Sequence, residues 1–482
     1  MLDAMREREV AIRGSSQETK EGSTLPAGWE HKTVGEMVEE MQYGTSAKTS
    51  LDASGVPVLR MGNIKDGSLV LDALKFLPAT HKEFPALLLQ DGDLLFNRTN
   101  SAELVGKSAV YRGNPSPCAC ASYLIRARLK PGYVPEFLAY YINSTFGRAW
   151  IRSVVSQQVG QANVNGTKLK ALSVPAPSLP EQQRIVAEIE KQFTRLEAGV
   201  AALRRVQANL KRYRAAVLKA ACEGRLVATE AELAKVENRK FESGEELLAR
   251  ILTERRQSWQ GRGKYREPAA PGTTSARALP NGWTWASVAQ VSATIVDCPH
   301  STAKFVADGL PCVDTTCIKP GRIVRERLRF VSLETFRERV ERLIPITDDI
   351  IFAREGTVGT AVAIPADMKP CLGQRVMLMR ADACILPRFF EHCLNSQVVR
   401  VQYLPKIVGS TAPHINVADV KLLALPLPPL AEQVRIVAEV DRCLSVVEGL
   451  QALMSDNLRR ATRLRQSVLQ RAFSGGFVKD AA

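Results

Sequence analysis

Two stretches of the chain carry apolar residues at the four- and three-residue steps of a heptad pattern. In the first stretch the positions are Ile189, Phe193, Leu196, Val200, Leu203, Leu210 and Val217. In the second they are Val440, Leu444, Val447, Met454, Leu458, Ala461 and Val468. This spacing predicts two helices of about 40 residues, roughly 60 Å long, each with one seam that buries against another helix. Gly224 and Gly475 follow the two patterns and predict where the helices end.

Short apolar runs, broken by glycine, proline and asparagine, precede each long helix. Runs at 56–60, 93–96 and 122–125 predict strands. Helical spacing of apolar residues predicts a helix over 132–150. Each long helix is therefore expected to follow a mixed α+β domain of about 150 residues, which is large enough to bury its own core.

The two halves of the chain repeat one another. Leu-Pro-Ala-Gly-Trp at 25–29 returns as Leu-Pro-Asn-Gly-Trp 254 residues later. The nine residues at 181–189 return 251 residues later with seven identities, and those at 93–98 resemble those 256 residues on. Because several blocks recur in the same order at slightly different offsets, the sequence indicates a duplicated unit with insertions and deletions.

The duplication predicts that the two long helices pair with each other as an antiparallel coiled coil, with pseudo-two-fold symmetry between the copies. Both helices belong to one chain and so meet at high effective concentration, although homodimerisation through the same seams is the alternative. The polar stretch 228–278, with a helix expected near 245–252, is either a linker or a docking segment for another subunit. The expected segments are 1–24 (polar), 25–179 (domain), 180–227 (helix), 228–278 (linker), 279–430 (domain) and 431–478 (helix).

Composition favours a polyanionic partner. Lys and Arg number 65 against 50 Asp and Glu, a net charge of +15. Aromatic residues are only 6%. Because proteins bind single-stranded nucleic acid by stacking its bases on aromatic side chains, double-stranded nucleic acid is the better candidate. No window has the apolar length of a membrane helix and the start of the chain lacks a secretory apolar core, so a cytoplasmic protein without a membrane partner is expected.

Catalytic and metal-binding motifs are missing from the sequence. The ten cysteines form no C-x-x-C pair, so they are expected to be reduced and buried, with no metal. Gly106-Lys107-Ser108 ends like a phosphate loop, but Ser101 stands where that motif requires glycine. No S-adenosylmethionine loop, base-methylation motif or paired nuclease acids occur. Two copies without a candidate active site indicate a binding protein.

The repeated blocks resemble the DNA-specificity subunit of type I restriction-modification systems over nearly the whole chain. The most specific block is the proline-rich entry followed by Glu-Gln-x-Arg-Ile-Val, at 179–186 and 430–437. Supporting blocks lie at 58–64, 93–98, 164–165 with 415–416, and 265–271. The resemblance implies an α+β fold with two target-recognition domains, each reading one half of a split site in double-stranded DNA.

The resemblance also implies partners and cofactors. The long helices would set the spacer between the half-sites and dock two modification (methyltransferase) subunits. Those subunits would supply methyl transfer from S-adenosylmethionine, and a restriction motor-nuclease subunit would supply cleavage with ATP and Mg²⁺. This chain would bind no cofactor and would not be catalytic by itself.

Candidate DNA-binding residues follow from the resemblance and from the donors and acceptors that base edges require. In the first copy they are Arg60, Asn63, Arg98, Thr99, Asn100, Lys107, Gln157, Gln158 and Gln161. In the second copy they are Lys319, Arg354, Gln374, Arg375, Ser410, Thr411 and His414. The alternatives are that Arg98 and Arg354 pair with local carboxylates, that Gln157 and Gln158 form plain loop, that His414 is a surface histidine, and that Lys107 meets only phosphate.

The loops after the shared Phe-x-Arg block differ between the copies, which predicts an asymmetric DNA target. Basic residues on the two helices fit either the DNA backbone or acidic patches of partner subunits. They are Arg204, Arg205, Lys211, Arg212, Arg214, Arg459, Arg460, Arg463 and Arg465. Two further interpretations remain: a coiled-coil scaffold whose domains bind proteins, and the specificity subunit of a related system in which methylation and cleavage share one polypeptide.

Overall fold

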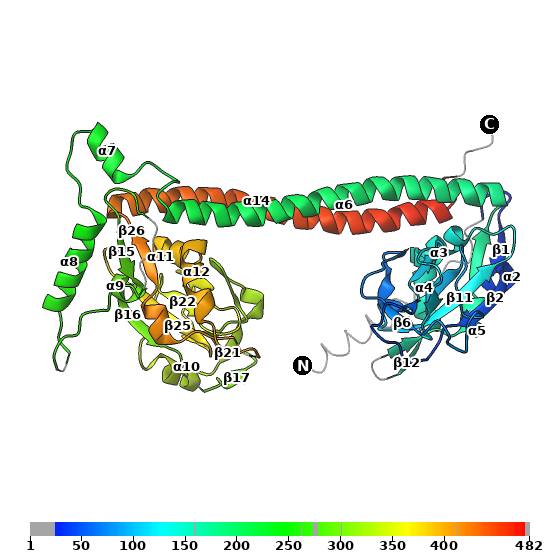
Figure 1. Cartoon of the computed structure of the whole chain (residues 1–482), viewed down its shortest axis with the longest axis horizontal. Coiled ribbons are helices and arrows are strands. Elements are labelled where there is room, and N and C mark those ends of the chain that lie inside the picture. Colours follow the sequence, from blue (N-terminus) through cyan, green and yellow to red (C-terminus); the bar gives the residue numbers. More distant parts are fainter. Residues whose placement is uncertain are drawn as a thin grey trace, which may run out of the picture. The chain divides into compact units, whose positions relative to one another are not determined.

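The computed structural model contains two compact units, which Figure 1 shows in colours that follow the sequence. Unit 1 comprises Met1–Leu203 and Asp456–Ala482, and unit 2 comprises Arg204–Ser455. The boundary crosses both long helices, so each unit contains one α+β body and one half of each helix. The structure describes residues 25–158, 161–261, 263–272, 278–299, 301–411 and 413–477.

Unit 1 is built around a four-stranded antiparallel sheet in the order β2-β11-β7-β9. Its strands are Val38–Tyr43 (β2), Leu124–Leu129 (β11), Leu94–Asn97 (β7) and Ser108–Val110 (β9). The smaller sheets contain β1 (Glu30–Thr33) with β14 (Ser173–Ala176), β10 (Ala119–Cys120) with β3 (Val56–Leu59) and β6 (Lys75–Leu77), β12 (Ser156–Gln158) with β13 (Gln161–Asn163) and β8 (Thr99–Asn100), and β4 (Ile64–Lys65) with β5 (Ser68–Leu69). The helices of the body are α2 (Val34–Met37), α3 (Pro135–Asn143), α4 (Thr145–Val154) and α5 (Gly166–Lys170).

Unit 2 repeats this plan with the antiparallel sheet β16-β25-β22-β23. Its strands are Ser292–Asp297 (β16), Val376–Ala381 (β25), Ile350–Ala353 (β22) and Ala361–Ala363 (β23). The smaller sheets contain β15 (Thr284–Ser287) with β26 (Ala424–Leu427), β17 (Phe305–Val306) with β21 (Arg329–Val331), β18 (Leu310–Val313) and β24 (Cys371–Leu372), and β19 (Ile318–Lys319) with β20 (Arg322–Ile323). The helices of the body are α9 (Val288–Val291), α10 (Leu333–Val340), α11 (Pro387–Leu394), α12 (Gln397–Tyr403) and α13 (Val417–Lys421).

The central strand of each sheet is buried on both faces, which explains its unbroken apolar run. In β7, Leu94 and Phe96 point into the core that also contains the helices, whereas Leu95 points into a second core on the opposite face. In β22, Ile350 and Ile351 divide between two cores in the same way. Each body is thus a sheet between two apolar layers.

The long helices α6 (Leu179–Cys222) and α14 (Leu430–Phe473) contain 44 residues each. In unit 1, Ile189 at the start of α6 shares a core with Val468 near the end of α14. In unit 2, Val217 near the end of α6 shares a core with Val440 at the start of α14. The order is reversed, so the helices pair antiparallel and the predicted intramolecular coiled coil is confirmed. Both helices end just before a glycine with positive φ, Gly224 at 63° and Gly475 at 81°.

The repeated sequence blocks join each body to its helix. The indole N–H of Trp29 donates to Glu181 at 3.1 Å, and that of Trp283 donates to Glu432 at 3.0 Å. These are the tryptophans of the Leu-Pro-x-Gly-Trp blocks and the glutamates of the Glu-Gln blocks. Trp283 and Glu432 are both buried, so the blocks recur because the joint between body and helix recurs.

The glutamines next to those glutamates fasten the backbone of the bodies. Gln182 accepts from the Val134 N–H at 3.0 Å and donates to the Pro177 carbonyl at 2.9 Å. Gln433 accepts from the Leu386 N–H at 3.0 Å and donates to a proline carbonyl at 3.2 Å. Each glutamine therefore satisfies a backbone donor and at least one backbone acceptor next to a helix start.

The helix predicted over 132–150 is two helices, α3 and α4. Ser144 separates them: its hydroxyl donates to the Tyr141 carbonyl and accepts from the Gly147 N–H, which ends one helix and caps the next. In unit 1 both helices lie on the side of the sheet that carries α6 (Figure 1), where Tyr140 packs edge-on against Phe193 at 5.6 Å.

The segment between the two copies packs on unit 2. It contains α7 (Glu230–Val236) and α8 (Gly244–Gln257). Leu247 and Ile251 of α8 are buried in the core of unit 2, and Arg255 pairs with Asp382 at 3.2 Å. In the part of the chain that is described, no helix is long and apolar enough to cross a membrane. All ten cysteines are free thiols, and nine of them are buried.

Candidate nucleic-acid interface

In unit 1 the candidate DNA-reading residues gather where β7 ends. Arg98 follows β7, and the next two residues form β8. β8 pairs with β13, which pairs with β12, and Gln158 stands opposite Gln161 in that register. The candidate residues that this small sheet brings together are Arg98, Thr99, Asn100, Gln157, Gln158 and Gln161.

Arg98 stacks on an aromatic ring. Its guanidinium lies 4.8 Å from the centre of the Tyr43 ring, and its Nη1 donates to the Ser122 carbonyl at 3.3 Å. Tyr43 is 43% exposed and Tyr123, just before β11, is 46% exposed. Sequence reasoning missed both tyrosines: Tyr123 lies just before β11, the neighbour of β7, and Tyr43 ends β2, the strand beyond β11. Exposed tyrosines beside an arginine form a surface that can meet a base or a ribose.

The remaining members of this cluster differ in how freely their side chains face solvent. Thr99 is buried, and its hydroxyl accepts from the Asn163 amide at 2.7 Å. The Asn100 oxygen accepts from the next backbone N–H at 2.8 Å, and Gln161 is exposed. Only the backbone of 157–158 lies within the described residues.

Arg60 and Asn63 lie in a separate segment, between β3 and β4. Asn63 is 3% exposed: its oxygen accepts from the Arg60 N–H at 2.9 Å and its amide donates to the Val70 carbonyl at 2.8 Å. The Arg60 guanidinium donates to the Ala73 carbonyl at 2.8 Å. These contacts hold the loop in shape.

In each unit, one arginine of a long helix holds a hairpin of the body, an arrangement that we call a clamp. In unit 1, Arg465 of α14 donates to the Asp66 carbonyl, in the turn of the β4–β5 hairpin, at 2.6 Å, and pairs with Glu197 at 3.1 Å. Lys107 lines a hollow of about 170 Å³ beside Arg465 and so lies against the helix pair. These contacts give Arg465 a partner within its own unit.

Unit 2 repeats the clamp with a residue of α6. Arg214 donates to the Pro320 carbonyl, in the turn of the β19–β20 hairpin, at 3.1 Å and pairs with Glu448 at 3.5 Å. Lys319 precedes Pro320 and is exposed. The candidate Lys319 therefore lies at a hairpin that the helix holds.

At the end of β22, Arg354 forms an ion pair with Asp297. The guanidinium lies 2.9 Å from one carboxylate oxygen, and its Nη1 donates to the Ile415 carbonyl at 3.4 Å. Arg354 is 9% exposed. Arg354 thus pairs with a local carboxylate, which was the alternative to contact with DNA.

The other candidates of unit 2 surround this ion pair. The Arg354 N–H donates to the Arg375 carbonyl at 2.9 Å, and His414 forms a β-bridge with Glu355. Arg375 is exposed, has a φ of 70° and pairs with Glu355 at 3.1 Å. Ser410 and Thr411 are exposed, and Gln374 is half-buried next to Arg375. The second cluster therefore contains Arg354, Gln374, Arg375, Ser410, Thr411 and His414.

The two clusters differ in chemistry although the strands beneath them match. The first presents tyrosines and amides around an arginine, and the second presents an Arg–Asp pair, a second arginine, hydroxyls and a histidine. Within the described ranges, no group of three or more His, Cys, Asp or Glu is placed to hold a metal ion. The arrangement offers hydrogen-bond donors and acceptors at two surfaces of different chemistry.

These features define a duplicated α+β protein whose bodies are fastened to an antiparallel helix pair. The family model described as the type I restriction modification DNA specificity domain matches residues 26–202 and 314–449, more than half of the chain. The chain belongs to this family.

Individual relatives agree with this assignment. The chain is 26% identical over 471 residues to the type I restriction enzyme StySPI specificity subunit of Salmonella potsdam, covering 94% of this chain and 89% of that protein. It is 29% identical over 218 residues to the EcoKI specificity subunit of Escherichia coli strain K12, covering 45% and 46%. A chain from a solved structure on complex assembly and conformational transition of the type I R-M system aligns with a TM-score of 0.61 at 19% identity, covering 93% of this chain and 98% of that one. That likeness shows a shared fold.

Proposed function

We propose that this chain directs a type I restriction-modification complex to a split, asymmetric DNA sequence, with each unit reading one half. The observation that carries the proposal is the pair of clusters at matching strand ends. Arg98 and Arg354 follow the equivalent strands β7 and β22, but their neighbours are Tyr43 and Asp297. Different side chains on the same framework would recognise different bases.

Members of each cluster are assigned to base edges. In unit 1 these are the exposed Gln161, the half-buried Asn100 and the two glutamines of β12; an amide can contact adenine in the major groove with two hydrogen bonds. In unit 2 Arg375 would contact guanine, and Ser410, Thr411 and His414 would approach the bases from the neighbouring loop.

Buried or internally paired candidates receive a positioning role. Thr99 and Asn63 use their side chains within the protein, and Arg354 is paired with Asp297. Lys107 and Lys319 lie beside the helix pair and are assigned to phosphates, which would raise affinity for every sequence. The net charge of +15 favours the same backbone contacts.

The helix pair is proposed to dock two modification subunits. On α14 of unit 2, Val446, Leu450 and Leu453 are 55%, 37% and 58% exposed, at the four- and three-residue steps of one helix face. On unit 1, Arg195, Gly199, Arg460 and Leu464 are among the residues that line a groove of about 760 Å³. Apolar residues exposed along one face are typical of a protein interface. The modification subunits would bring S-adenosylmethionine, and a restriction subunit would bring ATP and Mg²⁺ chemistry.

Methylation mapping tests the proposal. The chain is purified together with the modification subunit of its own system, and the methylated bases of a random DNA library are mapped. A split motif with a fixed spacer is expected, and it must disappear when this chain is omitted. Exchanging the body of unit 1 for that of another family member should change one half of the motif only.

Other outcomes distinguish the competing functions. A complex that forms, binds S-adenosylmethionine and methylates no discrete motif would favour a scaffold. A motif obtained with a single polypeptide that combines modification and cleavage would place the chain in a fused system. Two identical inverted halves would contradict the asymmetric reading.

A further inference from the structure

The segment that follows α8 forms a strap over the body of unit 2. The strap comprises 258–261 and 263–272, and two hydrogen bonds hold its far end. The Ser287 hydroxyl donates to the Ala269 carbonyl at 2.7 Å, and the Gly272 N–H donates to the Leu422 carbonyl at 3.1 Å. The strap is therefore attached to α13 and to the start of α9.

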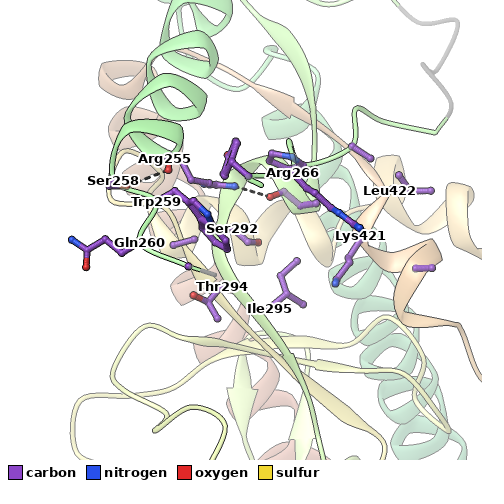
Figure 2. A pocket seen from close by; sticks show the side chains of 17 residues that line it. Arg255, Ser258, Trp259, Gln260, Arg266, Ser292, Thr294, Ile295, Lys421 and Leu422 are labelled. Carbon is purple, nitrogen blue, oxygen red and sulfur yellow. Dashed lines mark hydrogen bonds between the residues drawn. The ribbon is translucent and has the colours of Figure 1, made fainter. Parts of the chain in front are cut away.

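A pocket of about 720 Å³ lies between the strap and the sheet (Figure 2). Trp259 and Pro268 of the strap, Ile295 of β16 and Leu422, which follows α13, are among the residues that line it. Trp259 is 48% exposed and packs edge-on against Tyr265 at 5.7 Å. This volume is in the range of ligand-binding sites, and the walls are somewhat more apolar than polar.

Two buried hydroxyls at this pocket have no hydrogen-bond partner within the described residues. Ser292 lines the pocket and is 3% exposed, and its hydroxyl oxygen is unpaired. The hydroxyl of Tyr265, which also lines the pocket, is buried and unpaired. Unit 1 has Val38 at the position that matches Ser292. An unpaired buried hydroxyl is unfavourable, so both groups would be stabilised if their side chains turned to meet a polar ligand in the pocket.

The charge of the lining residues indicates the sign of the ligand's charge. Arg266 and Lys421 are exposed at one side of the pocket (Figure 2), and the lining residues described include no Asp or Glu. Arg255 is already engaged, because it donates to the Ala289 carbonyl at 3.0 Å and pairs with Asp382. The two remaining cations favour an anionic partner.

We propose that this pocket binds an acidic peptide segment of a partner protein, with one bulky apolar side chain inserted beside Trp259 and carboxylates placed near Arg266 and Lys421. The peptide backbone would satisfy the hydroxyls of Ser292 and Tyr265. Exposed tryptophan and arginine are the residue types that contribute most to protein interfaces. The inference does not depend on how the clusters read DNA.

Fluorescence anisotropy with the full-length chain tests this inference. The probe is a fluorescein-labelled peptide, Asp-Glu-Leu-Phe-Glu-Asp; the control peptides replace Leu-Phe by Gly-Ser or the acids by lysine. We expect binding of the first peptide only. Lys421→Glu reverses an exposed charge and should weaken binding about tenfold or more, which corresponds to about 1.4 kcal/mol. Lys170→Glu, the matching substitution at the end of α5 in unit 1, should leave the affinity unchanged.

Ser292→Val separates a binding role from a structural one. Valine is the residue of unit 1 at this position, and it removes the unpaired hydroxyl. The variant should raise the unfolding midpoint of the free chain. It should weaken peptide binding by about two- to tenfold, which is the loss expected for one hydrogen bond. Equal affinity in wild type and Lys421→Glu, or no binding up to about 1 mM, would overturn the proposal. So would a short single-stranded oligonucleotide that binds here in place of the peptide and depends on Lys421.

Discussion

The guanidinium of Arg354 lies 2.9 Å from the carboxylate of Asp297, and this ion pair spans the strand β25 that separates β22 from β16. In unit 1, Arg98 spans β11 in the same way and meets Tyr43 at 4.8 Å. One framework position thus serves an ion pair in one unit and a cation–π contact in the other. The difference gives each unit its own surface at the end of the sheet.

Removing the carboxylate of Asp297 should destabilise unit 2. Asp297→Ala leaves the buried Arg354 charge without its partner, which we expect to cost about 3 kcal/mol. Glu355→Ala is the control, because it breaks the more exposed pair with Arg375 and should cost less than about 1 kcal/mol. Urea unfolding measures both, and equal losses would contradict the assigned difference in burial.

Substitution of Gln161 should alter one half of the DNA motif. Gln161→Ala removes an exposed amide assigned to a base and should weaken discrimination at one position about 10- to 100-fold. Ser410→Ala should affect only the other half. Methylation of libraries randomised in each half separately measures these effects. Loss spread evenly over both halves would indicate a general contribution to affinity.

The two tryptophan joints should differ in strength. Trp283→Phe removes the hydrogen bond to Glu432, which is buried, and should cost about 1.5–3 kcal/mol. Trp29→Phe removes the same contact to the partly exposed Glu181 and should cost less, because water can replace the donor. Thermal unfolding of the two variants compares the joints, and a larger loss for Trp29→Phe would be the contrary result.

Glu391 should make stability depend on pH. Burial raises the pKa of this carboxyl, although the charges of Arg388 and His392 oppose the rise. In the folded protein the carboxyl therefore keeps its proton above the pH at which the unfolded chain releases it. The free energy of unfolding should fall as pH rises from about 4.5, the ordinary value, through the raised pKa.

Two variants isolate that contribution. Glu391→Gln should flatten this fall, measured as urea midpoints between about pH 4 and pH 8. Glu439 is the control with the opposite sign, since hydrogen bonds from Arg442 lower its pKa to about 2. Its stabilisation is complete above pH 4.5 and is lost as pH falls towards 2. Glu439→Gln should therefore lower the midpoint by a constant amount above pH 4.5, and should flatten the profile only on the acid side, measured down to about pH 2. An unchanged slope in Glu391→Gln would exclude the assignment.

The helix face of unit 2 should bind a modification subunit more tightly than the matching face of unit 1. Leu450 on the first face corresponds to Gly199 on the second, where an added Cβ would meet no heavy atom within 4 Å. Leu450→Glu should weaken one of two binding steps about tenfold, and Gly199→Glu should weaken the other step less. Native mass spectrometry of a titration counts the bound subunits. Equal effects would show that the two faces contribute alike.

Much of the fold was predictable because the heptad pattern is local in sequence and the repeat appears when the two halves are compared. The long helices and their glycine ends followed from spacing, and their antiparallel pairing followed from the duplication. The partner of Arg354 did not, because Asp297 is separated from it by a strand pairing that no local pattern reveals. Asn63 was expected to face DNA, yet its amide holds the loop around it. The sequence did not reveal this because the hydrogen bonds within a loop depend on its three-dimensional path. The break at Ser144 was missed because the apolar spacing continues across it.

Several of the hydrogen bonds that fasten each body to the helices are made to its backbone. Arg465 and Arg214 donate to the carbonyls of Asp66 and Pro320, and Gln182 and Gln433 bind backbone N–H and C=O groups. These hydrogen bonds do not depend on the side chains of the body. Loops elsewhere on the body can therefore accumulate substitutions while these attachments persist. Inheritance of new specificities on an unchanged assembly would follow from these few hydrogen bonds.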